Sequence, residues 1–307
     1  MLDAALLGTG GMTPLPTRFL TSLMLRVNGS QLVVDCGEGT QVTMKLLGWG
    51  YKNIDVLCFT HFHADHIAGL PGLLHAINTS VRREPLTLVG PPGLKAVAAG
   101  LMVIAKELEY EVNIIEIPYR RFGPPESIKL GDHLIGALPL DHRGPCLGYS
   151  FEYKRAGLFD VEKARANNVP MAFWSRLQKK GEAIEEMGVV YKPEMVMGPP
   201  RRSIKVSYCT DTRPVPNLPE FIKGSDLFVC EGMYGDIEML PKTASHKHMI
   251  FQEAAEIAKE AAVKELWLTH YSPALTQPEQ QLPVARGIFP NTVCGRDRMV
   301  KVINYED

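Results

Sequence analysis

The feature that most constrains this chain is a short segment in which four potential metal ligands occur within six residues. The segment, 60–66, reads Thr-His-Phe-His-Ala-Asp-His and follows an apolar run, 54–59, that is typical of a buried strand. A helical pattern begins at residue 67. The ligands therefore lie on a strand-to-helix loop, which a rigid scaffold can hold still. Because imidazole and carboxylate groups suit zinc and similar cations, this density favours a metal site over a polar surface loop.

Several later strand patterns also end in a side chain that can bind a metal ion or a proton. These side chains and their patterns are His142 after 134–140, Asp211 after 204–209, Glu231 after 226–230 and His270 after 265–269. A carboxylate at such a point can bridge two cations with its two oxygens, and His142 can serve as a third imidazole for the first cation. We expect these groups to gather along one rim of the fold.

Two other strand ends carry features whose role the sequence leaves open. Asp35 follows the strand 31–34 and can either support a nearby site or cap the helix predicted from residue 41. The glycine-rich turn 8–11 follows the strand 3–7 and can cradle a phosphate. Because no helical pattern comes directly after these glycines, a turn beside a cleft is the better interpretation.

The bulk properties favour a cytoplasmic enzyme. A chain of 307 residues fits one large α/β domain or two small ones. Its net charge of −1 provides no global basic field for nucleic acid, although a local patch can still bind one. The six cysteines form no C-x-x-C pair, which predicts buried thiols in a reducing compartment. We find neither a secretory leader nor an apolar run approaching the roughly 20 residues of a membrane span.

Strand and helix patterns alternate along the chain, which predicts α/β layers. Asn28-Gly29, between the strand patterns 21–25 and 31–34, predicts a tight hairpin. We also predict an amphipathic helix over 94–108.

The segment 156–202 differs in character from the rest and is predicted to be an insertion that projects from the body. It lacks the periodicity of a packed core, and its basic residues alternate with aromatic residues. Cations can contact phosphates while rings stack on bases, so the segment suits a polyanion. The alternative is a solvated excursion or a contact between subunits. The aromatic residues in question are Phe159, Phe173, Trp174 and Tyr191.

The His-x-His-x-Asp-His pattern resembles the signature of the metallo-β-lactamase superfamily, in which two metal ions activate water for hydrolysis. Within that superfamily the order of motifs is similar to that of the ribonuclease Z family, the tRNA 3′-processing endoribonucleases. The resemblance covers nearly the whole chain. It implies a four-layer αβ/βα sandwich of two mixed sheets with outer helices, formed as a single domain over 1–307 with an exosite-like arm at 156–202. The motifs that carry it are 60–66, 140–149, 210–214, Glu231, His248 and 268–272.

The resemblance also implies a role for each site residue. Two zinc ions are expected, with manganese or iron as alternatives. Asp65 would act as a ligand and as a proton acceptor, and His248, held by Glu231, would protonate the leaving oxygen. The first metal would be bound by His61, His63 and His142, and the second by Asp65, His66 and His270, with Asp211 bridging the two.

The implied activity is cleavage of precursor tRNA at its 3′ side by a water molecule that two metals activate. The family resemblance further implies a homodimer in which the arm of one subunit serves the other subunit's site. Two alternatives remain: a related phosphodiesterase with a small substrate, and a binding module without catalysis. The complete set of ligands argues against the binding module, and the arm separates the two enzymatic hypotheses.

Overall fold

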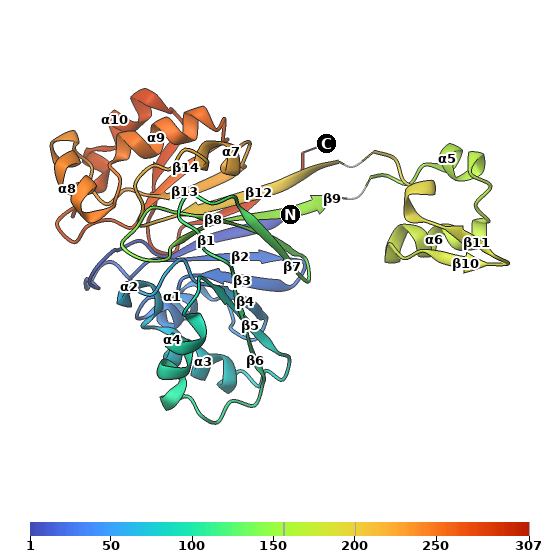
Figure 1. Ribbon diagram of the computed structural model, residues 1–307, viewed down its shortest axis with the longest axis horizontal. Helices are drawn as coiled ribbons and strands as arrows, with labels where there is room; N and C mark the ends of the chain where they lie inside the picture. The colour runs from blue at the N-terminus through green and yellow to red at the C-terminus, as the bar shows by residue number, and fades with distance from the viewer. Residues whose placement is uncertain (156, 200, 307) are drawn as a thin grey trace. The chain divides into compact units, whose positions relative to one another are not determined.

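The computed structural model describes residues 1–155, 157–199 and 201–306, and its core consists of two seven-stranded sheets (Figure 1). In the first sheet, the neighbouring strands β16, β1, β2 and β3 pair antiparallel with one another in that order. The neighbouring strands β3, β4, β5 and β6 pair in parallel. The predicted hairpin at Asn28-Gly29 connects β2 and β3, and both turn residues have positive φ, as a tight hairpin requires. The strands in spatial order are β16 (Val300–Ile303), β1 (Leu2–Gly8), β2 (Ser22–Val27), β3 (Ser30–Val34), β4 (Ile54–Cys58), β5 (Leu86–Gly90) and β6 (Val112–Glu116).

The second sheet is also mixed. Its strands β12 to β15 pair in parallel, and β7 to β9 pair antiparallel. The two sheets contact each other through buried side chains: the Tyr149 hydroxyl donates a hydrogen bond of 2.6 Å to the carbonyl oxygen of Phe59. The strands in spatial order are β15 (Thr292–Cys294), β14 (Leu266–Thr269), β13 (Leu227–Glu231), β12 (Arg201–Cys209), β9 (Leu147–Arg155), β8 (His133–Pro139) and β7 (Glu126–Leu130).

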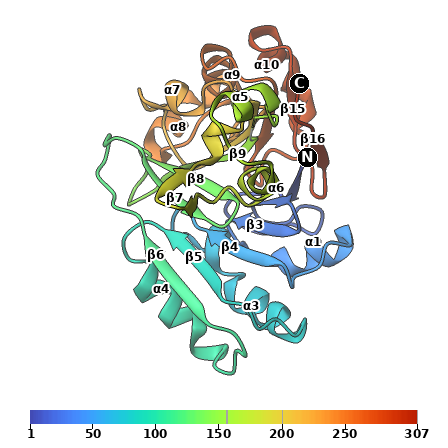
Figure 2. The same ribbon diagram turned by 90° about the vertical axis from the view of Figure 1, so that its right-hand side faces the viewer.

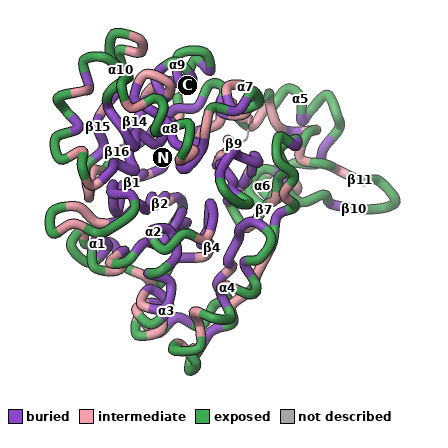
Figure 3. Tube along the Cα trace, turned by 60° about the vertical axis from the view of Figure 1, so that its left-hand side comes forward, coloured by how far each residue is buried: buried purple, intermediate pink, exposed green. Residues whose placement is uncertain are grey.

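Helices cover the outer face of each sheet, as Figures 1 and 2 show. Each group of helices forms an apolar cluster with its own sheet, and burial follows the strands while the outward sides of the helices are exposed (Figure 3). The predicted arrangement of two mixed sheets with outer helices is therefore confirmed. The helices are α1 (Thr40–Leu47), α3 (Leu70–Thr79) and α4 (Leu94–Leu101) on the first sheet, and α7 (Leu218–Ile222), α9 (Phe251–Glu260) and α10 (Leu282–Ile288) on the second.

The helix predicted over 94–108 is wrong in length. The α-helix α4 ends at Leu101, and a single 3₁₀ turn, η1 (Met102–Ile104), follows it. Val103 and Ile104 are exposed, so the apolar periodicity that suggested a longer helix does not correspond to a buried face here.

Residues 153–203, together with 305–307, form a second compact unit of the chain, while residues 1–152 and 204–304 form the first. The second unit contains α5 (Val161–Ala166), α6 (Met171–Lys180) and the hairpin of β10 (Ile184–Glu186) and β11 (Val189–Tyr191). Ala156 and Pro200, which belong to the predicted insertion, lie outside the described residues.

The second unit has a small core of its own, contrary to the expectation that 156–202 lacks one. Ala164, Val169, Leu177, Ile184 and Val196 are buried in it. The aromatic residues expected to stack on bases instead pack against this core, with the Phe159 and Trp174 rings 5.2 Å apart and the Phe173 and Tyr191 rings 5.3 Å apart. The sequence pattern did not reveal this core, because each of the two short helices contributes only one buried residue.

The predicted burial of the cysteines is confirmed, since all six thiols are buried and unpaired. Within the described residues, every helix is too short or too polar to cross a membrane.

Candidate metal centre

The candidate ligands lie where strands of the two sheets end. The segment 60–66 follows β4, His142 follows β8, Asp211 follows β12 and His270 follows β14. Asp211 and His270 each have a φ of 55°. This left-handed conformation is uncommon for residues other than glycine, and strained backbone of this kind clusters at functional sites. At both positions it occurs at the residue that turns out of the sheet toward the other ligands.

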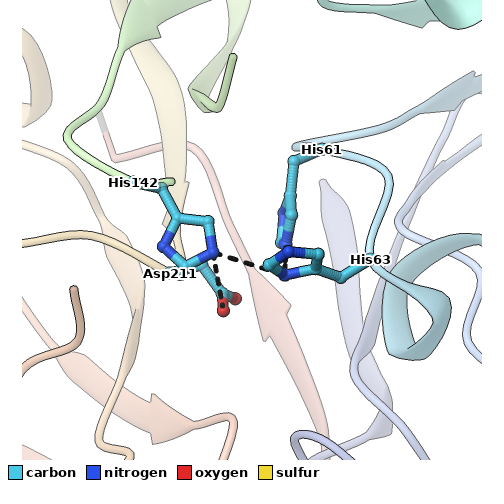
Figure 4. A group of neighbouring side chains, drawn as sticks. All are labelled: His61, His63, His142 and Asp211. Carbon is cyan, nitrogen blue, oxygen red and sulfur yellow. Dashed lines mark hydrogen bonds and ion pairs between the residues drawn. The ribbon is translucent and has the colours of Figure 1, made fainter. Parts of the chain in front are cut away.

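The first group of ligands consists of His61, His63, His142 and Asp211, whose side chains point toward one another in Figure 4. The Nε2 atom of His61 lies 2.9 Å from Nδ1 of His63, and Nε2 of His142 lies 3.3 Å from the same Nδ1 atom. Asp211 Oδ1 is 4.0 Å from Nε2 of His142. The four ligand atoms thus surround one point between the sheets.

The second group consists of Asp65, His66 and His270, again with Asp211 beside it. The Nε2 atoms of His66 and His270 are 3.1 Å apart. Asp65 Oδ2 lies 3.5 Å from the first of these atoms and 3.4 Å from the second. Asp211 Oδ2 lies 3.0 Å from Nε2 of His66 and 3.1 Å from Nε2 of His270.

Asp211 therefore connects the two groups, with Oδ1 directed at the first and Oδ2 at the second. Around a tetrahedral zinc ion with Zn–N bonds of about 2.05 Å, neighbouring ligand atoms are about 3.3 Å apart. The distances between ligand atoms in the two groups run from 2.9 to 4.0 Å and so lie on both sides of this value. The chemistry and the spacing of the donors thus fit two cations bridged by one carboxylate, and all seven predicted ligands lie together.

Asp35 supports the second group, which resolves its open role. One of its oxygens accepts a hydrogen bond of 2.8 Å from the Thr60 backbone, and the other lies 2.8 Å from Nδ1 of His66. A proton on Nδ1 leaves the lone pair of Nε2 directed at the second group, so Asp35 orients this histidine for metal binding. The helix α1 has Gly39 at its N-cap and no side-chain cap, so the capping role is wrong.

The charges in the centre favour a cation. Burial raises the pKa of Asp211, but the imidazoles of His270 and His66 outweigh it and hold this pKa well below its usual range. Burial lowers the pKa of His142 to about 4, which keeps this imidazole neutral and able to bind a metal. Burial also lowers the pKa of His66, yet the carboxylates of Asp211 and Asp35 raise it well above its ordinary value. Positive charge is thus stabilised at this point, and a bound cation would supply it.

His248 lies at the edge of the centre, with Nδ1 2.9 Å from Glu231 Oε2 and 3.6 Å from Asp211 Oδ1. Burial alone would lower the pKa of His248, but the Glu231 carboxylate, through its charge and its hydrogen bond, raises it to about 9. Glu231 is itself fixed, because its Oε1 accepts a hydrogen bond of 2.7 Å from the Thr212 backbone. Arg213 donates to the backbone oxygen of His248 and pairs with Glu253.

The neighbouring His246 lies at the end of α8 (Leu240–His246) and forms no hydrogen bond or ion pair with Glu231 among the described residues. Both histidines line a cavity of about 440 Å³ that opens onto the metal ligands. The other residues that line it include Met12, His63, Arg143, Asp211, Met233, Tyr234, Lys242 and Ser272.

Comparison with known proteins identifies the family. The chain is 51% identical to ribonuclease Z of Lachnoclostridium phytofermentans over 306 residues, which covers 100% of this chain and 99% of that relative. It is 53% identical to ribonuclease Z of Clostridium kluyveri over 308 residues, with 100% of both chains covered. The chain belongs to the ribonuclease Z family. It is therefore a metal-dependent endoribonuclease of the tRNA 3′-processing type, as the motifs predict.

Solved structures agree on the fold. Human tRNase Z, short form, has a TM-score of 0.71 at 24% identity, covering 98% of this chain and 99% of that one. The metallo-β-lactamase fold protein YhfI of Bacillus subtilis has a TM-score of 0.69 at 18% identity, with 98% of both covered. A family model described as anti-Pycsar protein Apyc1 matches residues 2–96, a part of the chain that includes the segment 60–66.

In this member of the ribonuclease Z family, the glycine turn 8–11 packs against the metal centre. Gly11 lies so close to His270 that a Cβ atom on it would be 2.7 Å from the imidazole carbon Cε1. The next residue, Met12, donates a backbone hydrogen bond of 2.6 Å to Asp65 Oδ2. The turn thus fixes two ligands of the second group, and the interpretation as a turn beside a cleft agrees with the structure.

Gly11→Ala is expected to weaken metal binding about ten- to a hundredfold, the usual effect of disturbing a residue that positions a ligand. The new methyl group would overlap the imidazole of His270, since its carbon would lie 2.7 Å from Cε1 and 2.9 Å from Nε2, so the ring has to shift from its place among the ligands. Titration of the metal-free protein with zinc measures the affinity. Gly50→Ala is the control, since a Cβ atom there meets nothing within 4 Å. Equal zinc affinities for the two variants would contradict this role for Gly11.

Proposed function

We propose that this chain cleaves precursor tRNA at its 3′ side with two zinc ions held by the seven ligands of the metal centre. The observation that carries the proposal is the position of Asp211, whose two oxygens face the two groups of ligands. Imidazole-rich groups with a shared carboxylate favour zinc, although manganese and iron accept the same donors. When bound, such a pair of cations neutralises a phosphodiester and lowers the pKa of a water molecule between them.

Asp65 is proposed to bind the second metal and to accept the proton of the attacking water. Its Oδ2 atom faces His66 and His270 at 3.5 and 3.4 Å and accepts the hydrogen bond from Met12. The carboxylate is thus held in one orientation on the floor of the cavity. The pKa of Asp65 supports this role in part: burial raises it, but the hydrogen bond and charge of His270 lower it below its usual value, so the group is ionised.

His248 is proposed to donate a proton to the leaving 3′ oxygen, with Glu231 orienting its ring. A ribose oxygen leaves poorly unless it is protonated, so cleavage of RNA needs an acid on this side of the phosphate. His248 meets the geometric requirement, because it lines the cavity while Nδ1 is bound to Glu231, which directs Nε2 away from that carboxylate. The hydrogen bond that the Arg213 guanidinium donates to the backbone oxygen of His248 holds the same residue in place.

The second unit is proposed to be the RNA-binding arm of the otherwise single-domain enzyme. Most of its cations are exposed, while its aromatic rings pack internally, so its contribution is electrostatic contact with phosphates and not base stacking. Arg176, Lys179 and Lys180 lie exposed on α6 and have no carboxylate partner among the described residues. The alternative is a related phosphodiesterase for a small substrate, which would use the same metal centre and would not need the arm.

Deleting residues 160–198 and joining the ends with a short glycine linker is expected to abolish cleavage of precursor tRNA. Hydrolysis of bis(p-nitrophenyl) phosphate should persist, because the arm has its own core and every metal ligand belongs to the first unit. The charge-reversal variant K179E/K180E is the milder comparison, and it should lower tRNA cleavage in a salt-dependent manner. If the deletion variant cleaves precursor tRNA at the normal rate, the small-substrate alternative gains support and the arm's role fails.

We also propose that the enzyme acts in the cytoplasm as a homodimer in which each arm serves the partner's site. Mixing the inactive deletion variant with an inactive Asp211→Ala variant tests this arrangement. Mixed dimers contain one intact site and one arm, so part of the tRNA cleavage should return if the arm acts in trans. A mixture that stays inactive while forming mixed dimers would contradict it.

A further inference from the structure

A second recess adjoins the metal cavity, and its residues have no role in the mechanism above. It has a volume of about 180 Å³ and shares four lining residues with the metal cavity, so the two spaces lie side by side. The shared residues are Tyr234, Lys242, Ser272 and Ala274. The recess therefore lies within reach of a substrate whose phosphate occupies the metal centre.

The lining of the recess is suited to a flat, partly polar ring. Tyr234, Met239, Ala274 and Leu275 provide an aromatic and apolar surface, and Asp236 and Gln281 add polar groups that can pair with the edge of such a ring. Tyr234 is 7% exposed. The backbone N–H of Phe251 donates a hydrogen bond of 3.1 Å to the carbonyl oxygen of Tyr234 and fixes its backbone. Its hydroxyl has no hydrogen-bond partner among the described residues, so a ligand can supply one. An aromatic surface with an available hydroxyl is a common way for proteins to bind an unstacked base.

A lysine side chain lies at the border between the recess and the metal cavity. Lys242 lies on α8 with its Nζ atom 5.2 Å from the centre of the Tyr234 ring, and it lines both the metal cavity and the recess. Among the described residues, no carboxylate lies within ion-pair distance of it. Its charge is thus available for a phosphate group between a base in the recess and the scissile bond.

We propose that this recess binds the base of the nucleotide on the 5′ side of the cleaved bond, with Lys242 contacting that nucleotide's backbone. This inference rests on the proposed function. The oxygen that His248 protonates belongs to this nucleotide, and α8, which carries Lys242, ends just before His248 in the sequence. The nucleoside attached to the leaving oxygen therefore lies on the same side of the metal centre as the recess.

The test combines changes in the enzyme with removal of single bases from the RNA. The substrates are a precursor tRNA, the same RNA with an abasic site 5′ of the cut, and the same RNA with an abasic site 3′ of the cut. Wild-type enzyme should lose about five- to a hundredfold in kcat/KM with the 5′ abasic RNA, because a stacked base contributes roughly that much. Tyr234→Leu should show a much smaller difference between the intact and 5′ abasic RNAs, since its recess no longer presents a ring.

Lys242→Gln provides a second variant at an exposed position where folding is not at risk. It should raise KM for the intact RNA and lower the slope of log KM against log salt by about one phosphate contact. Lys259→Gln is its control, because Lys259 is an exposed lysine on α9 that lines neither space. Lys259→Gln should leave KM and the salt slope unchanged.

Each result supports or overturns the inference. If the 5′ abasic site costs Tyr234→Leu as much as it costs the wild type, the base does not bind the recess and the inference fails. If the coupling appears only with the 3′ abasic RNA, the assignment to the 5′ nucleotide is wrong. If wild-type enzyme hydrolyses bis(p-nitrophenyl) phosphate but does not cleave intact precursor tRNA, the proposed function fails and this inference fails with it.

Discussion

Replacing Asp211 with alanine should remove nearly all activity on both precursor tRNA and bis(p-nitrophenyl) phosphate. This carboxylate is the only group that faces both sets of ligands among the described residues, so its loss affects both cations together. A catalytic metal contributes several kcal/mol of transition-state stabilisation, and each 1.36 kcal/mol is tenfold in rate. The expected loss in kcat is therefore about 10³-fold or more, and metal analysis of the purified variant should find fewer than two ions per chain.

Asp226→Ala is the matched control for Asp211→Ala. Asp226 is also a buried strand-terminal acid of the second sheet, but it precedes β13, at the opposite end from the metal centre, and pairs with Lys264. Its loss should lower thermal stability and leave metal content and kcat nearly unchanged. An Asp211→Ala protein that retains two ions and normal turnover would show that the bridging position is wrong.

The sequence indicated which side chains lie together because the candidate ligands follow a simple rule of position. His142, Asp211 and His270 each come after an apolar strand, and the ends of neighbouring strands lie along one edge. Only the segment 60–66 is dense enough to indicate metal binding by itself. The other ligands were identified from the order of motifs along the chain, because an isolated strand end does not indicate which distant residue it will contact.

The residues that position the ligands were harder to predict. Thr60 and Asp35 form a local network with His66, but Asp35 looked equally suited to capping a helix. Gly11 contacts His270 across 259 positions of sequence, which no local pattern encodes. Arg213 belongs to a recognised motif, yet its bond to the His248 carbonyl depends on how α9 packs. Of these residues, only Thr60 and Arg213 lie within two positions of a predicted ligand in the sequence, so only these two could be sought beside the ligands.

The core of the second unit was missed for a different reason. Its buried residues are spread over two short helices, a hairpin and a turn, so no window contains a full period of apolar positions. The same rings that suggested base stacking are the ones that close this core. The composition identified the basic character of the segment correctly. Composition does not distinguish an aromatic ring that is exposed to RNA from one that packs in an apolar core.

His248→Ala should slow the cleavage of precursor tRNA about 10²–10⁴-fold, the usual contribution of a general acid. The same variant should hydrolyse bis(p-nitrophenyl) phosphate at close to the normal rate, because p-nitrophenolate leaves without being protonated. Glu231→Gln should show the same separation to a smaller degree, since the ring of His248 keeps a hydrogen-bond partner but loses the negative charge beside it. Single-turnover rates with both substrates measure the effect apart from product release.

His246→Ala distinguishes a specific acid from a general disturbance of the cavity. His246 lies only two positions away and lines the same cavity, but among the described residues it forms no hydrogen bond or ion pair with Glu231. Its loss should affect the two substrates to a similar extent. If His248→Ala also lowers both activities equally, the imidazole contributes to binding or to the shape of the metal centre, and the proton must come from another group. Separation of the substrates by His248→Ala alone would instead locate the proton donor on the side of the phosphate where α8 and α9 meet.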